Sequence, residues 1–110
     1  MFNEMLAMGS GSGGADMSPL FGKVVISSMV QPYTVDRFFM SCIGINTIRF
    51  AITAGTGGYD LYGWVGETET LIGSYTKGTT QTVDVSSYER LSGRGNGGAN
   101  ATLTDVTVID

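Results

Sequence analysis

The sequence predicts an all-β protein with a single antiparallel β-sandwich. From residue 20 onward, apolar and polar residues alternate with a period of two, which is the pattern of half-buried strands. Turn residues, mainly glycine, interrupt this alternation at intervals of about 8–12 residues. No long helical pattern separates the strands, as the crossovers of a parallel sheet would require. A chain of 110 residues has the size of one domain.

The beginning of the chain differs from this pattern. Residues 1–8 are apolar and rich in methionine, and we interpret the glycine- and serine-rich residues 9–19 as a flexible linker to a domain at 20–110. A helix as short as residues 1–8 forms in water only when it docks on something. Apolar side chains at helical spacing therefore predict a partner-binding anchor made of Met1, Phe2, Met5, Leu6 and Met8. A frayed terminus and packing against its own domain remain alternatives.

The first half of the domain predicts strands at residues 23–30, 34–43 and 48–52. Val24, Ile26 and Val30 lie on one face of the first strand. Ile48, Phe50 and Ile52 lie on one face of the third, opposite Arg49, Ala51 and Thr53. Residues 44–46 predict a tight hairpin turn between the second strand and the third.

The second half predicts strands at residues 59–65, 70–75, 81–85, 88–91 and 101–109. Residues 93–100 form a glycine-rich loop before the last strand. In that strand the apolar positions change phase between Leu103 and Val106. Such a slip of one residue predicts a β-bulge near Asp105.

The sequence predicts no enzymatic activity. The chain has no histidine to activate Cys42, its single cysteine, which lies in an apolar run and is expected to be buried. Glu67 and Glu69 are side by side on a turn, whereas glycosidases need two carboxylates across a cleft. Residues 93–98 fit the G-x-G-x-x-G motif, but a strand follows where dinucleotide binding needs a helix. We therefore expect no catalytic residue and no cofactor.

The charge pattern disfavours several classes of binding partner. Only 15% of the residues are charged, the formal net charge is −4, and the six basic residues are scattered. This balance disfavours nucleic acid and anionic membrane surfaces. No apolar run is long enough for a transmembrane helix, and the start of the chain does not resemble a signal peptide. We expect synthesis in a cytoplasm, no membrane insertion, and a homo-oligomer, with a trimer favoured, that covers the low-charge surface.

Three residues of one predicted strand form a candidate binding site. Asp60, Tyr62 and Trp64 share a face, where flat rings can stack on sugars and a carboxylate can accept hydroxyl hydrogen bonds. A glycan or receptor platform is one interpretation, and ordinary packing or a subunit interface is the alternative. Asp84 and Asp105 are candidates for a calcium site with backbone carbonyls, but the sequence has no dense Asp/Asn loop, so no metal is expected.

Two resemblances add to these expectations. Residues 82–91, the glycine loop and residues 101–108 resemble the last strands of galactose-binding-like jelly-roll modules, over less than a third of the chain. This resemblance implies that the antiparallel sandwich is jelly-roll-like, and it supports the fold more than any ligand.

The opening residues 1–9 and the glycine–serine run resemble small bacteriophage virion proteins of tail or head appendages. The resemblance implies that the N-terminal piece attaches and the β domain is displayed. The resulting hypothesis is a structural or accessory protein located in the virion, with other virion proteins as partners. The alternative is a carbohydrate- or receptor-binding module that attaches to a glycan of the host surface.

Overall fold

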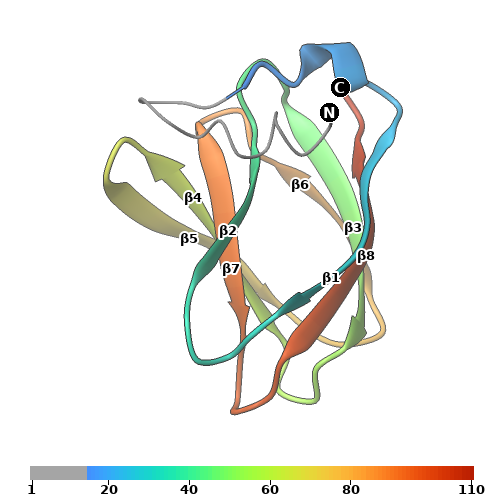
Figure 1. The fold of residues 1–110 in the computed structure, drawn as a ribbon, viewed down its shortest axis with the longest axis vertical. Helices are drawn as coiled ribbons and strands as arrows, with labels where there is room; N and C mark the ends of the chain where they lie inside the picture. The colour runs from blue at the N-terminus through green and yellow to red at the C-terminus, as the bar shows by residue number, and fades with distance from the viewer. Residues whose placement is uncertain (1–14) are drawn as a thin grey trace.

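The computed structural model describes residues 15–110 and folds them into two antiparallel four-stranded sheets packed face to face (Figure 1). A short 3-10 helix, η1 (Ser18–Leu20), precedes the strands. The first sheet has the order β1 (Val24–Gln31), β8 (Ala101–Val108), β3 (Thr47–Ala54), β6 (Thr80–Asp84). The second has the order β2 (Arg37–Ser41), β7 (Arg90–Gly95), β4 (Tyr59–Val65), β5 (Thr68–Tyr75). The predicted all-β antiparallel sandwich is confirmed. Consecutive strands lie in opposite sheets, except for β4 and β5, which pair with each other, and this is the strand arrangement of a jelly roll.

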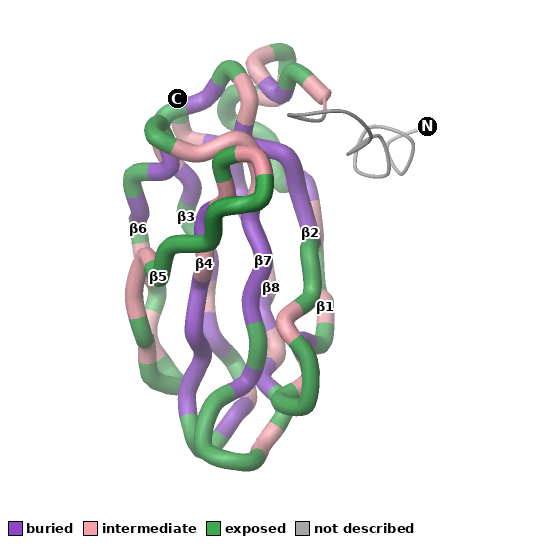
Figure 2. Tube along the Cα trace, turned by 90° about the vertical axis from the view of Figure 1, so that its left-hand side faces the viewer, coloured by how far each residue is buried: buried purple, intermediate pink, exposed green. Residues whose placement is uncertain are grey.

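The core fills the space between the two sheets. Phe50 of β3 packs edge-on against two rings of the opposite sheet, with centroid distances of 6.3 Å to Tyr59 and 5.8 Å to Tyr75. The buried Tyr59 hydroxyl donates a hydrogen bond of 2.7 Å to Oε1 of Gln31, which is itself buried. Figure 2 shows buried residues along β4 and β7, whereas β5 is mostly exposed. One core therefore joins both sheets and leaves their outer faces open.

The β-bulge predicted near Asp105 is confirmed. In the pairing of β8 with β3, Thr107 lies opposite Arg49 and Thr104 lies opposite Ala51, so two residues of β8 face one residue of β3. Asp105 has a φ of 55°, which places it in the left-handed region. The bulge lets Val106 and Thr107 be buried one after the other.

The hairpin predicted at residues 44–46 is wrong. Strand β2 pairs with β7, whereas β3 pairs with β6 and β8 in the other sheet. The segment 44–46 therefore crosses from one sheet to the other. Turn residues indicate that the chain changes direction, but they do not indicate which strand will pair with the next one.

Two other predictions need correction. Val24 and Val30 are exposed, and β1 turns Val25 and Gln31 inward instead. A register shift between Val24 and Ile26 breaks the simple alternation that we expected on this strand. The predicted loop 93–100 is shorter than expected, because β7 continues to Gly95.

The packed domain begins earlier than residue 20. Met17 is fully buried in the core, and its backbone N–H donates a 2.8 Å hydrogen bond to the carbonyl of Ile43. Asp16 forms a parallel bridge with the same residue. The predicted linker 9–19 is therefore wrong for its last residues. The predicted anchor residues Met1, Phe2, Met5, Leu6 and Met8 lie outside the described residues. No helix within 15–110 is long and apolar enough to cross a membrane.

Candidate functional site

The outer face of the second sheet gathers aromatic and basic side chains. Trp64 of β4 lies opposite Arg90 of β7, and Phe38 of β2 lies opposite Ser92 on the far side of β7. Ser92 also lies opposite Tyr62 of β4, on the other side of β7. Two residues further along β4, Asp60 lies opposite Arg94. We call the set of outward rings and guanidinium groups the aromatic–arginine face; its members are Phe38, Tyr62, Trp64, Arg90 and Arg94.

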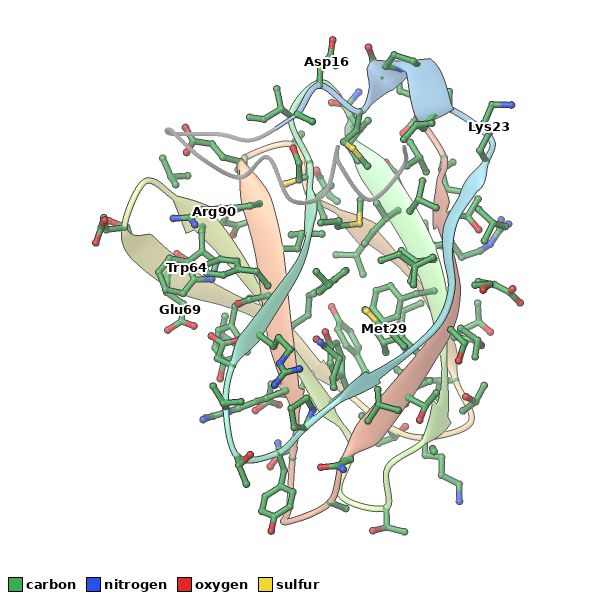
Figure 3. The ribbon with its side chains drawn as sticks, in the orientation of Figure 1. Asp16, Lys23, Met29, Trp64, Glu69 and Arg90 are labelled. Carbon is green, nitrogen blue, oxygen red and sulfur yellow. The ribbon has the colours of Figure 1, made fainter. Side chains whose placement is uncertain are left out.

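The indole of Trp64 is fixed in place. Its Nε1 donates a 2.7 Å hydrogen bond to the hydroxyl of Ser92, which is buried. The ring of Phe38 lies 5.0 Å away at a tilt of 55°. Figure 3 shows Trp64 beside Arg90, on the outside of the second sheet. Trp64 is partly exposed and does not belong to the core, so its ring is available at the surface.

Arg90 lies against the rings of both Phe38 and Trp64. Its guanidinium carbon lies 4.4 Å from the centroid of the Phe38 ring and 5.5 Å from that of Trp64, both within cation–π range. Its Nη2 donates a 2.6 Å hydrogen bond to the carbonyl of Gly66 in the turn between β4 and β5. Its Nε is buried and has no hydrogen-bond partner among the described residues. The cation is therefore held by two rings and one carbonyl.

Asp60 has a structural role on the same face. Its carboxylate oxygen Oδ1 accepts hydrogen bonds of 2.8 Å from the Ser74 hydroxyl and 2.9 Å from the Asn96 amide. The side chain is buried, so it ties β4 to β5 and to the loop after β7. The structure does place Asp60, Tyr62 and Trp64 on one face, but it presents only the two rings outward. Arg94 covers Tyr62, with its guanidinium carbon 5.9 Å from the ring centroid.

A pair of carboxyl groups borders this face. A hydrogen bond between the side chains of Glu69 and Asp36 raises the pKa of Glu69 from its ordinary value of 4.5 to about 7. Slight burial and the negative charge of Asp36 act in the same direction, and Arg94 opposes them. Glu69 is therefore mostly protonated below a pH of about 7 and mostly ionised above it.

This pair predicts a pH dependence of stability. Because the folded protein binds the Glu69 proton more tightly than the unfolded chain does, its contribution is fully present below pH 4.5 and is lost as the pH rises through about 7. We expect the thermal midpoint to fall across that range in wild type. Glu69→Gln should remove most of this slope, whereas Glu67→Gln, a neighbouring exposed control, should keep it. Equal slopes for the two variants would contradict the assignment.

Cys42, Asp84 and Asp105, the other residues considered in the sequence, have local contacts or conformations of their own. Cys42 is buried, its thiol donates to the carbonyl of Tyr88, and burial followed by the charge of Glu89 raises its pKa to about 12. Asp84 accepts hydrogen bonds from the backbone N–H and the hydroxyl of Ser86, and Asp105 occupies the bulge. Within residues 15–110, no three His, Cys, Asp or Glu side chains are grouped to hold a metal ion.

No protein-family model, curated protein or solved structure matches this chain. Its fold and the chemistry of the aromatic–arginine face are therefore the observations that bear on its function.

Proposed function

We propose that the protein is a non-catalytic structural or accessory protein of a phage particle, which displays a jelly-roll domain and binds a partner through its aromatic–arginine face. The observation that carries the proposal is the Phe38–Arg90–Trp64 stack on the outside of a sheet whose inner face already closes the core. These rings are not needed to fill the sandwich. They are available for a partner.

The composition of this face fits protein recognition. Tryptophan, tyrosine and arginine are the residues that contribute most to the free energy of binding at protein interfaces. The hydrogen bond from Trp64 to Ser92 and the bond from Arg90 to Gly66 fix two of these side chains before a partner arrives. Fixed side chains lose less conformational entropy on binding, which improves affinity. Double-sheet jelly rolls also occur in viral capsid and lectin domains, an analogy at the level of the fold.

The N-terminal segment supplies the attachment in this proposal. Residues 1–8 carry five large apolar side chains, and three of them, Phe2, Met5 and Leu6, are the ones that we expect to be buried. Their burial in a groove of another virion protein contributes on the order of 5–8 kcal/mol before ordering costs. Methionine suits such a groove because its side chain adapts to irregular pockets.

The second candidate is recognition of a host-surface glycan or receptor. The exposed ring surfaces of Tyr62 and Trp64 favour it, since both project from β4 on the same side. Aromatic faces of this kind stack on sugar rings, and Arg94 next to Tyr62 is a donor for sugar hydroxyls. In this version the same face binds the host while residues 1–8 hold the particle.

One experiment with two variants tests the proposal. Particles are assembled with wild-type protein, with a chain lacking residues 1–14, or with Trp64→Ala, and are then assayed for incorporation and for binding to host cells. The truncated chain should be lost from particles. Trp64→Ala should be incorporated but should bind its target at least about tenfold more weakly, as for loss of one interface hot spot.

The control is Thr82→Ala, an exposed substitution on the other sheet that should change neither property. Normal incorporation of the truncated chain contradicts the anchor. If particles that carry Trp64→Ala bind host cells as tightly as wild type does, the role of the face is contradicted. If glycosidase treatment of the host cells abolishes binding, the glycan version is favoured over a protein partner.

A further inference from the structure

Strand β5 is an open edge of the second sheet. The strand order β2-β7-β4-β5 leaves one side of β5 without a neighbouring strand in the described part of the chain. Its first four residues, 68–71, are all exposed, and Figure 2 shows the strand exposed along most of its length. An edge of this kind presents a row of backbone N–H and C=O groups that can pair with another strand.

The other three edges are better protected against such pairing. β1 lies between Lys23 and Pro32, and a register shift interrupts it. β2 has only five residues and begins with Arg37, and β6 also has five and ends on Asp84. Charges, proline, short length and irregular register are the usual devices that block edge-to-edge association.

β5 has few of these devices. It is eight residues long and contains no lysine, arginine or proline. Its single charged residue is Glu69, which lies opposite Trp64 of β4. Directly opposite side chains project to the same face, so Glu69 projects from the outer face of the sheet and not beyond the β5 edge. The one irregularity is a bulge at residue 72, between the pairs Leu61–Gly73 and Tyr62–Leu71.

We propose that β5 pairs antiparallel with β5 of a second copy of this chain, so that the two four-stranded sheets become one continuous sheet. The two-fold axis passes midway between the Leu71 residues of the two copies. An antiparallel pair related by a two-fold axis perpendicular to the sheet must place one residue opposite itself, because directly opposite side chains project to the same face. Leu71 suits that position, since it is an outward apolar residue that is 52% exposed in the single chain.

This register also fits the charges and the bulge. Glu69 falls opposite Gly73 of the second copy, so the only charged residue of the strand does not meet its own copy. The two Glu69 positions lie about 14 Å apart along the strand direction, at roughly 3.4 Å per residue. The bulge at residue 72 disturbs the alternation of side chains just before Gly73, and a glycine has no side chain to misplace. Thr70 lies opposite Ile72, which completes the paired segment.

The dimer has a consequence for recognition, which rests on the proposed function. A two-fold axis perpendicular to the joined sheet turns both outer faces to the same side. The two aromatic–arginine faces then lie on one surface and can engage a repeated target together. Two linked sites bind more tightly than one because the second contact is intramolecular.

The test combines solution mass with a cross-link. Sedimentation velocity of the full chain over a wide range of concentration should show a reversible species of twice the chain mass. Leu71→Cys should form an intermolecular disulfide on mild oxidation, because residues opposite each other have Cα atoms about 4.5–5.5 Å apart, within disulfide range. Thr80→Cys is the matched control, an exposed position on edge strand β6, and should remain uncross-linked. The native Cys42 is buried and should not contribute.

Two further variants separate edge pairing from packing of the faces. Leu71→Lys should give a monomer, because two lysines meet at the axis, whereas Trp64→Ala should remain a dimer. A monomeric or trimeric wild type, equal cross-linking of the two cysteine variants, or loss of the dimer in Trp64→Ala would each overturn the proposal. The dimer and the proposed function can be contradicted independently, because Trp64→Ala is expected to lose partner binding and to keep the dimer.

Discussion

Phe50→Ala is expected to lower the free energy of unfolding by about 3–5 kcal/mol, as for other buried Phe-to-Ala changes. Phe50 is 1% exposed and lies on β3, in the centre of the first sheet. Its ring contacts Tyr59 and Tyr75 edge-on at 71° and 74°, and both tyrosines belong to the second sheet. Removing the ring therefore opens a cavity between the sheets and also removes two aromatic contacts across them.

Urea unfolding followed by tryptophan fluorescence measures this change, because Trp64 is the only tryptophan. Phe38→Ala serves as the control. Phe38 is 47% exposed, so its loss should cost less than half as much as the loss of Phe50. Equal destabilisation by the two variants would contradict the packing described for the core. A domain of this size has a total stability of about 5–15 kcal/mol, so Phe50→Ala should remove a large part of it.

The alternation of side chains predicted the strand faces where nothing disturbs the alternation. Ile48, Phe50 and Ile52 were expected on one face of their strand, and all three are buried. The phase change between Leu103 and Val106 predicted the bulge, because an extra residue shifts every later side chain to the opposite face. Both features depend only on the order of residues within one strand, so they can be predicted from the sequence.

The prediction failed on β1 because a polar residue occupies its inner face. Gln31 is buried and accepts the hydrogen bond of Tyr59, which satisfies its side-chain oxygen inside the core. The valines at 24 and 30 face outward instead. Residue polarity alone assigns the opposite phase to this strand. The partner that makes a buried glutamine acceptable lies on another strand of the other sheet.

The candidate site was predictable in part for a similar reason. Tyr62 and Trp64 are two residues apart on one strand, so the period of two places them together. Phe38 and Arg90 come from β2 and β7, and only the order of strands in the second sheet brings them beside Trp64. Strand order depends on long-range pairing, which the alternation does not encode.

Met17→Ala is expected to lower the free energy of unfolding by about 2–5 kcal/mol, the range for deletion of a large aliphatic side chain from a core. The sequence places Met17 in a stretch rich in glycine, serine and proline, for which we predicted a flexible linker. The structure buries its side chain completely, and its backbone N–H donates a hydrogen bond to the carbonyl of Ile43, two residues after β2. A residue in a solvated linker would contribute almost nothing to stability.

The measurement is the urea midpoint and slope of Met17→Ala beside Pro19→Ala, an exposed neighbour two residues later. Pro19→Ala should change the free energy of unfolding by less than about 1 kcal/mol. If Met17→Ala behaves like Pro19→Ala, the domain begins after η1, and the N-terminal segment is tethered by a longer linker. If Met17→Ala is destabilised as expected, the packed domain begins at or before Met17, ahead of η1.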